Sequence, residues 1–386
     1  MDLDQIRTNL ERYIDTVTDP RTGNALQHPL NSILFCSIFA VLAGADNFKA
    51  IYHWTEAKQD WLQQFLDFPA GVPSHDTFCR VFQLIDPDEL RRCFVRWSRV
   101  MASQQEDLVA IDGKTLRRSF QEGDPETALE VVSAWASTNE LVLSGVGVAN
   151  GKERRGLLET LELLDLEGCT VSMDALGCDR GIARQIGQQG SDYLMVVKGD
   201  QPKLYDQLET FWHWALDETR PDDQSLPPIE HVRDVDRAHG RIETRQLHWT
   251  QATDALHLNR DRPYLEGFGC LYTRRNITGG ETTETIHYLI SSHDNPEVDD
   301  LLSKRRRHWG VENQTHWVLD VVFDEDHNRS RLEHAAENLA LIRRMVMNIL
   351  REDDRKDTSL KQKRNQLAWD FDYFLQVLAD GAAANL

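Results

Sequence analysis

The sequence lacks the features of a membrane protein or a zinc protein. Its 386 residues contain no run of about 18 apolar residues, so we expect no transmembrane helix and no membrane partner. None of the six cysteines belongs to a C-x-x-C pair, which argues against a structural zinc site. Several of these cysteines lie inside apolar runs, as buried thiols do, so we expect a cytoplasmic protein. The first twenty residues are polar and charged, unlike a signal peptide.

Positive charge is also scarce. The chain has 43 Lys and Arg residues against 63 Asp and Glu, and its formal net charge is −20. Proteins that bind nucleic acids generally have a basic surface, so the total charge argues against that class. Contact with DNA needs only a local positive face, however, and carboxylates that bind metal ions add negative charge of their own. The net charge therefore does not exclude DNA binding.

The pattern of the sequence changes along a chain long enough for two or three domains. Residues 1–104 are predicted to be helical. Residues 105–216 contain a short apolar run, a predicted hairpin and then alternating helices and strands, which is typical of an α/β domain with a mixed sheet. Residues 217–296 begin with a Pro-rich stretch and continue with predicted strands. We expect residues 297–352 to return to the α/β core and residues 353–386 to form a helical tail.

Two apolar segments that are predicted to be buried strands each end at an aspartate. Asp112 follows residues 108–111, and Asp174 follows residues 170–173. Ligands of α/β sheets gather outside the carboxyl ends of the strands, where a carboxylate is costly to bury unless it binds something. Either aspartate alone is equally typical of a helix cap or a turn. Two of them in neighbouring parts of one sheet favour a metal site.

Carboxylate ligands suit magnesium, which usually takes one or two of them and keeps positions open for phosphate and water. Two such ions about 4 Å apart stabilise both oxygens of an in-line phosphoryl displacement, and they require a third acid from a later element. The best candidate is Glu312, one helical turn after His308, in a segment whose basic residues suit DNA phosphates. An acid in a charged helix is also typical of a solvated face. Four acids further along the chain could bind the metal ion in place of Glu312 or form hydrogen bonds to the residues that bind it: Asp320, Asp324, Glu325 and Asp326.

Motifs spread over almost the whole chain, from about residue 26 to residue 378, match those of a known family. They are HPL from His28, GVPSHDTF from Gly71, DGKTLR from Asp112, DALGC from Asp174, KGDQP from Lys198, HGRIETR from His239, HWGVEN from His308 and HWVLDV from His316. Each motif alone is weak, but their number and order are specific. With them, the chain resembles the H-repeat-associated DDE transposases of bacterial insertion sequences.

This resemblance implies an RNase H-like core, a mixed sheet with flanking helices, in which Asp112, Asp174 and Glu312 form the metal-binding triad. It implies a β-rich insertion before the final glutamate and an N-terminal helical domain that helps to recognise transposon ends. The implied cofactor is two Mg²⁺ ions, for which Mn²⁺ substitutes. The implied partners are double-stranded DNA with terminal inverted repeats, target DNA and a second copy of the chain, so that a homodimer acts on DNA at the bacterial nucleoid.

Further residues in or beside the matching motifs are expected to contact DNA: Lys114, Lys198, His239, Arg241, Arg245, Arg305, His308 and Trp309. Ordinary surface lysines fit the positions of Lys114 and Lys198 equally well. The two arginines of the HGRIETR motif are equally typical of exposed strand charges. Trp309 suits stacking on a displaced base, although a core tryptophan is the more common alternative.

The sequence departs from the family pattern in places. Arg118 stands where the family has glycine, residues 151–156 replace an expected Lys-Ser-Asn-Glu segment, and Asp200 replaces an asparagine. Leu319 stands where related transposases outside this group carry lysine. No acid of the triad is lost. The leading hypothesis is a transposase that cuts and joins insertion-sequence ends by two-metal hydrolysis and transesterification. The alternatives are a domesticated DNA-binding or regulatory protein of transposase origin and a metal-dependent nuclease without strand transfer.

Overall fold

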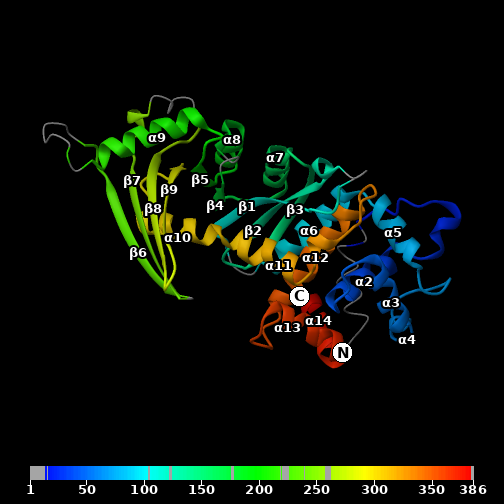
Figure 1. Cartoon of the computed structure of the whole chain (residues 1–386). Coiled ribbons are helices and arrows are strands. Elements are labelled where there is room, and N and C mark those ends of the chain that lie inside the picture. The colour runs from blue at the N-terminus through cyan, green and yellow to red at the C-terminus, as the bar shows by residue number, and fades with distance from the viewer. Residues whose placement is uncertain are drawn as a thin grey trace. The chain divides into compact units, whose positions relative to one another are not determined.

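The computed structural model describes residues 14, 16–102, 105–120, 124–174, 178–217, 219, 226–238, 240–256 and 262–383. The chain divides into two compact units, which we describe separately (Figure 1). Unit 1 comprises residues 1–105, 113–164 and 311–386, and unit 2 comprises residues 106–112 and 165–310. Strand β1 (Leu108–Thr115) contributes to both, because the division falls after Asp112.

Unit 2 contains a mixed sheet with the strand order β1-β4-β5-β9-β8-β7-β6. Strands β1, β4 (Thr170–Met173) and β5 (Asp192–Val197) are parallel to one another. Strands β9 (Thr282–Ser291), β8 (Gly267–Ile277), β7 (Arg241–Thr250) and β6 (Glu230–Ala238) continue the sheet in antiparallel fashion. Strand β4 and most of β5 are buried, as expected for apolar parallel strands that are covered on both faces.

Three helices accompany this sheet: α8 (Arg180–Gln188), α9 (Pro202–Ala215) and α10 (Val298–His308). The aromatic ring of Trp212 on α9 lies 6.3 Å from that of His248 on β7. Leu301 of α10 instead belongs to a buried cluster with Leu247, the neighbouring residue of β7. Because successive side chains of a strand point to opposite faces, α9 and α10 cover opposite faces of the sheet. Unit 2 also has a short 3₁₀ turn, η4 (Thr253–Ala255).

In unit 1 the last residues of β1 lie beside the antiparallel hairpin of β2 (Leu129–Ala136) and β3 (Leu141–Ala149). Its described helices from the first half of the chain are η1 (Gly23–Gln27), α2 (Leu30–Leu42), α3 (Phe48–Ala57), α4 (Gln59–Leu62), α5 (His75–Leu84), α6 (Pro87–Met101), η2 (Pro125–Thr127) and α7 (Glu153–Leu163). The C-terminal part adds the π-helical segment η6 (Val311–His316), α11 (Trp317–Val321), η7 (Glu325–His327), α12 (Ala335–Glu352), α13 (Leu360–Trp369) and α14 (Phe371–Ala383).

Helix α12 is the centre of unit 1. It packs against α2, α5, α6 and β3, and its residues from Ala335 to Leu350 are buried on every side. A helix that is buried all round has no solvated face, so its charged side chains must find partners inside the protein. These partners define the buried polar contacts described below.

The predicted fold class is confirmed: a mixed α/β sheet with flanking helices, helices in the N-terminal part and antiparallel strands before Glu312. The boundaries of the five predicted segments stay predictions. Among the described helices, none is both long enough and apolar enough to cross a bilayer.

Two details differ from the predicted strands. Strand β1 does not end at residue 111 but continues through Asp112 to Thr115, because its last residues lie beside β2 after the pairing with β4 has stopped. Strand β6 lies in the segment 217–296, where strands are predicted, but its own residues do not indicate a strand. Most of its residues are charged and none is buried, so it lacks the apolar alternation from which strands are recognised.

Candidate active site

Strands β1 and β4 carry the two predicted aspartates to one edge of the sheet in unit 2. The strands are parallel, and their last paired residues are Ile111 and Met173. Asp112 and Asp174 follow at equivalent positions on neighbouring strands, which lie about 4.8 Å apart in a sheet. Both residues are half-buried. The register therefore brings these two acids together at the carboxyl edge, where ligands of α/β sheets bind.

Three basic side chains surround Asp174. Its Oδ2 accepts a hydrogen bond from Lys198 Nζ at 2.7 Å. Its Oδ1 lies 3.5 Å from His308 Nε2 and 3.8 Å from Arg305 Nη2. Burial acts to raise the pKa of Asp174, but His308, Arg305 and Lys198 outweigh it and hold the pKa well below its usual range. The carboxylate is therefore ionised at neutral pH.

Several buried polar atoms of Asp174 and Arg305 form no hydrogen bond with the described residues. Within the described part of the chain, Asp174 Oδ1 and the Nε and Nη1 atoms of Arg305 are buried without a hydrogen-bond partner. Arg305 is 5% exposed, and its guanidinium lies 5.5 Å from the ring of Trp309. Buried polar groups are normally hydrogen-bonded, so unsatisfied atoms of this kind are unusual.

The imidazole ring of His308 lies between the side chains of Ser172 and Asp174. Its Nδ1 lies 2.8 Å from Ser172 Oγ, and burial lowers the pKa of the ring below its usual range. The ring is therefore neutral at pH 7, with Nδ1 accepting from the hydroxyl and the Nε2 proton facing Asp174. This chain of contacts fixes the orientation of the carboxylate.

Other arginines of unit 2, among them the predicted DNA contacts on β7, are paired with acids of the same unit. Arg306 binds Asp234 at 2.9 Å and Asp236 at 3.0 Å. Arg245 binds Glu243 at 2.9 Å, and Arg241 lies 3.6 Å from the same carboxylate.

The arginine that follows Arg306 is paired with an acid in the same way. Arg307, beside Arg306, binds Asp107 at 2.6 Å. Trp309 is 47% exposed, so it is not a core residue. His239 lies outside the described residues.

Glu312 lies in unit 1, on the π-helical segment η6, with an exposed side chain. The sequence places Glu312 one helical turn after His308, whereas the chain forms α10, η6 and α11 in succession, with His308 at the end of α10 and Glu312 on η6. π-helical turns occur frequently at functional sites. Convergence of Glu312 with the two aspartates stays a prediction. In the described residues, no three His, Cys, Asp or Glu side chains gather closely enough to hold a metal ion.

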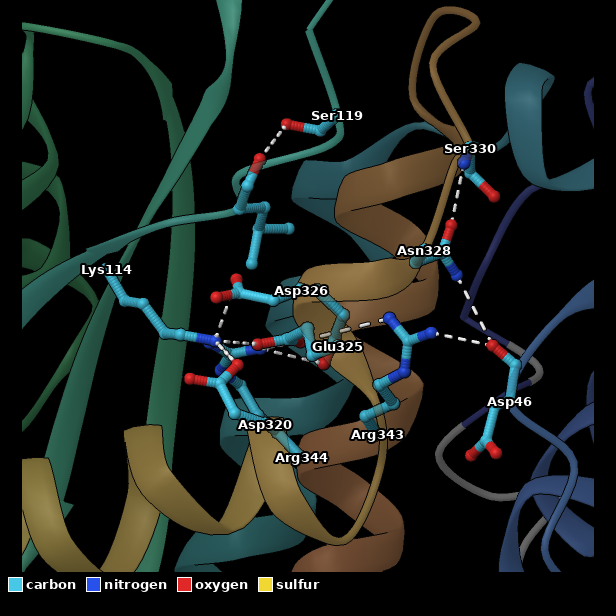
Figure 2. A network of polar contacts seen from close by, with 12 residues as sticks. Asp46, Lys114, Ser119, Asp320, Glu325, Asp326, Asn328, Ser330, Arg343 and Arg344 are labelled. Atoms are coloured by element: carbon cyan, nitrogen blue, oxygen red, sulfur yellow. Dashed lines mark hydrogen bonds and ion pairs between the residues drawn. The ribbon is translucent and has the colours of Figure 1, made fainter. Parts of the chain in front are cut away.

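Lys114 does not face solvent as a phosphate-binding lysine would. Its side chain is 10% exposed, and its Nζ binds Asp320 and lies 3.4 Å from Glu325 and 3.5 Å from Asp326 (Figure 2). Three of the four acids that were predicted as alternative ligands, Asp320, Glu325 and Asp326, thus surround one lysine of unit 1. Sequence reasoning missed Arg344 of α12, which binds the buried Glu325 at 3.1 Å. A charge inside an apolar helical run was the available signal for it.

A mixed sheet with paired acids at its carboxyl edge and basic side chains around them is typical of α/β domains that bind metal ions and phosphates. Comparison with known families defines the chain further. The family model described as "Transposase DDE domain" matches residues 103–349, and the model described as "DDE_Tnp_1-associated" matches residues 11–98. The chain belongs to the DDE-domain transposase family.

Curated relatives extend over nearly the whole chain. YbfL of Escherichia coli (strain K12) is 34% identical over 377 residues, which cover 96% of this chain and 97% of the relative. The "H repeat-associated putative transposase YhhI" of the same strain is 33% identical with the same coverage. A cryo-EM structure of a piggyBac transposase synaptic complex with hairpin DNA aligns with a TM-score of 0.41 and 11% identity, covering 99% of this chain and 79% of that one.

Proposed function

We propose that the protein is a transposase that cuts the ends of an insertion sequence and joins them to DNA. The observation that carries the proposal is the register of β1 and β4, which sets Asp112 and Asp174 side by side in a chain of the DDE-domain family. Membership of this family implies DNA as the partner and dependence on a divalent metal ion. The remaining steps of the proposal concern how this chain's residues would perform the reaction.

The residues at the sheet edge fit a divalent cation. Carboxylate oxygens are the ligands that Mg²⁺ and Mn²⁺ prefer. In the described part of the chain, Asp174 Oδ1 is buried and makes no close hydrogen bond, since His308 and Arg305 lie 3.5 and 3.8 Å away, so this oxygen retains capacity to bind a cation. We assign Asp112, Asp174 and Glu312 as the ligands of two Mg²⁺ ions, for which Mn²⁺ substitutes. When bound, such a pair activates the attacking oxygen and stabilises the leaving oxygen of an in-line displacement.

The basic residues around Asp174 would handle the DNA strand. Arg305 is buried and offers N–H groups that have no partner among the described residues, which suits a phosphate oxygen. Lys198 is half-exposed, so its ammonium group can pass from Asp174 to a phosphate. His308 is held by Ser172 and keeps Asp174 in place. The exposed ring of Trp309 suits stacking on a base at the cut end.

The DNA partner would carry terminal inverted repeats, and the cut end would then attack target DNA. Joining two ends requires two active sites, so we propose a homodimer with two-fold symmetry on the DNA at the bacterial nucleoid.

A cleavage assay tests this function. The purified protein is incubated with labelled duplex DNA that contains the sequences flanking its gene, in Mg²⁺. We expect cut ends and joined products, and we expect Asp112→Asn, Asp174→Asn and Glu312→Gln to abolish both. Glu281→Gln, at an exposed turn of unit 2, is the control and should act as the unchanged protein does. Cutting without joined products would indicate a nuclease, and binding without cutting would indicate a DNA-binding or regulatory protein.

A further inference from the structure

We propose that Lys114 is a positioning residue, which holds the segment that carries Glu312 against strand β1. This segment, residues 311–321, comprises η6 and α11 and is called the Glu312 segment below. The importance of its placement rests on the proposed function, in which Glu312 is a metal ligand. The contacts themselves all lie within unit 1.

Lys114 joins strand β1 directly to the Glu312 segment. Its ammonium group binds Asp320 of α11 and lies within 3.5 Å of Asp326, and Arg117 approaches Asp326 at 3.3 Å from the other side. Lys114 is only 10% exposed on its side chain. A lysine that is so little hydrated depends on these carboxylates, because leaving a buried charge without a partner is costly.

The network continues into the centre of unit 1 (Figure 2). Glu325 is fully buried and binds Arg344 Nη1 at 3.1 Å and Arg343 Nη1 at 3.9 Å. Arg344 also donates to Ser133 Oγ of β2 at 3.2 Å and to the Ala340 carbonyl at 3.0 Å. Lys114 therefore connects the Glu312 segment to the sheet and to the central helix α12.

A second contact holds the Glu312 segment closer to Glu312 itself. The carbonyl of Gln314 accepts a hydrogen bond from Arg351 of α12, whose guanidinium lies 4.6 Å from the centre of the Trp135 ring on β2. The segment is thus held at Gln314 and at Asp320, and Glu312 lies two residues before the first of these. Because the Glu312 side chain is exposed, this anchoring does not use its carboxylate.

Lys114 and the proposed metal ligand Asp112 lie on the same strand, β1. Lys114 follows Asp112 by two residues on β1, so the two side chains point to the same face of the strand. Strand β1 therefore carries two residues of the proposed site. One is Asp112, a proposed metal ligand, and the other is Lys114, which holds the segment that carries the proposed ligand Glu312. Ligands of a catalytic site must be placed to within about 0.5 Å, and an error of about 1 Å can cost about 100-fold in rate.

Two substitutions of Lys114 and a matched control test the proposal. Lys114→Met removes the charge, and Lys114→Arg retains it. Lys363→Met removes another lysine of unit 1 that is 7% exposed and donates to the carbonyls of Leu350 and Asp353, neither of which belongs to the Glu312 segment. The measurements are amide hydrogen exchange, resolved by peptide, and the Mg²⁺ concentration that gives half-maximal DNA cleavage.

We expect Lys114→Met to raise exchange in residues 311–321 about tenfold while exchange in α2 stays unchanged. The Mg²⁺ requirement should also rise about tenfold, since a displaced ligand binds the ion less well. Lys114→Arg should restore most of both properties, and Lys363→Met should leave exchange in residues 311–321 unchanged. If Lys114→Met does not fold, Asp320→Asn replaces it with the same expected result.

Unchanged exchange in residues 311–321 would overturn the proposal, as would an equal increase throughout unit 1. Failure of the unsubstituted protein to cut DNA would contradict the proposed function instead. The exchange measurement does not depend on cleavage, so the two failures are distinguishable.

Discussion

Replacing Glu325 by glutamine should destabilise the protein and change how its stability depends on pH. Burial acts to raise the pKa of Glu325, but Arg344, Lys114 and Arg343 outweigh it and lower the pKa from 4.5 to about 2. A carboxyl group whose pKa is lower in the folded state stabilises the fold above its unfolded pKa, and this contribution is lost as the pH falls toward the folded pKa. At about 1.4 kcal/mol for each pKa unit, Glu325 contributes about 3 kcal/mol at pH 7.

Urea unfolding followed by circular dichroism at pH 7, 5, 4 and 3 measures this contribution. We expect Glu325→Gln to lose about 3 kcal/mol at pH 7, and we expect the difference from the unsubstituted protein to shrink as the pH falls below about 4.5. The control Glu281→Gln removes an exposed carboxylate and should unfold as the unsubstituted protein does. A Glu325→Gln variant within about 0.5 kcal/mol of the unsubstituted protein at every pH would refute this reasoning.

Two further predictions concern packing in unit 1, and urea midpoints test both. Leu339→Ala, at a fully buried position of α12, should cost about 2–5 kcal/mol, whereas Leu332→Ala, at a position 63% exposed, should cost less than about 0.5 kcal/mol. A Cβ on Gly147 would lie 2.4 Å from Glu337 Cδ, so Gly147→Ala should cost about 1–3 kcal/mol. Its control is Gly199 of unit 2, where nothing lies within 4 Å of an added Cβ, so Gly199→Ala should be neutral. Equal effects within either pair would contradict the packing described here.

Much of the fold could be predicted from short-range patterns. The apolar residues before Asp112 and Asp174 mark buried strands, and strands β1 and β4 do occur there in parallel. A buried strand reveals itself because its side chains are apolar on both faces. Strand β6 could not be predicted in this way, because its residues are exposed or half-exposed and mostly charged.

The partners of the charged residues could not be predicted, because they lie far away in the sequence. Arg306 and Arg307 resemble a DNA-binding run, yet the fold pairs them with Asp234 and Asp107. Lys114 meets Asp320 across 206 residues of chain. Ion pairing of this kind depends on tertiary structure, and no local periodicity encodes it.

The most direct test of the account asks whether Asp112 touches the metal ion that cuts DNA. Asp112→Cys replaces the carboxylate by a thiolate, which Mg²⁺ accepts poorly and the softer Mn²⁺ accepts better. Direct ligation predicts that the variant fails to cut DNA containing the ends of the element in Mg²⁺ and regains measurable cutting in Mn²⁺. Equal behaviour of the variant in the two metals, whether active in both or inactive in both, would contradict this assignment.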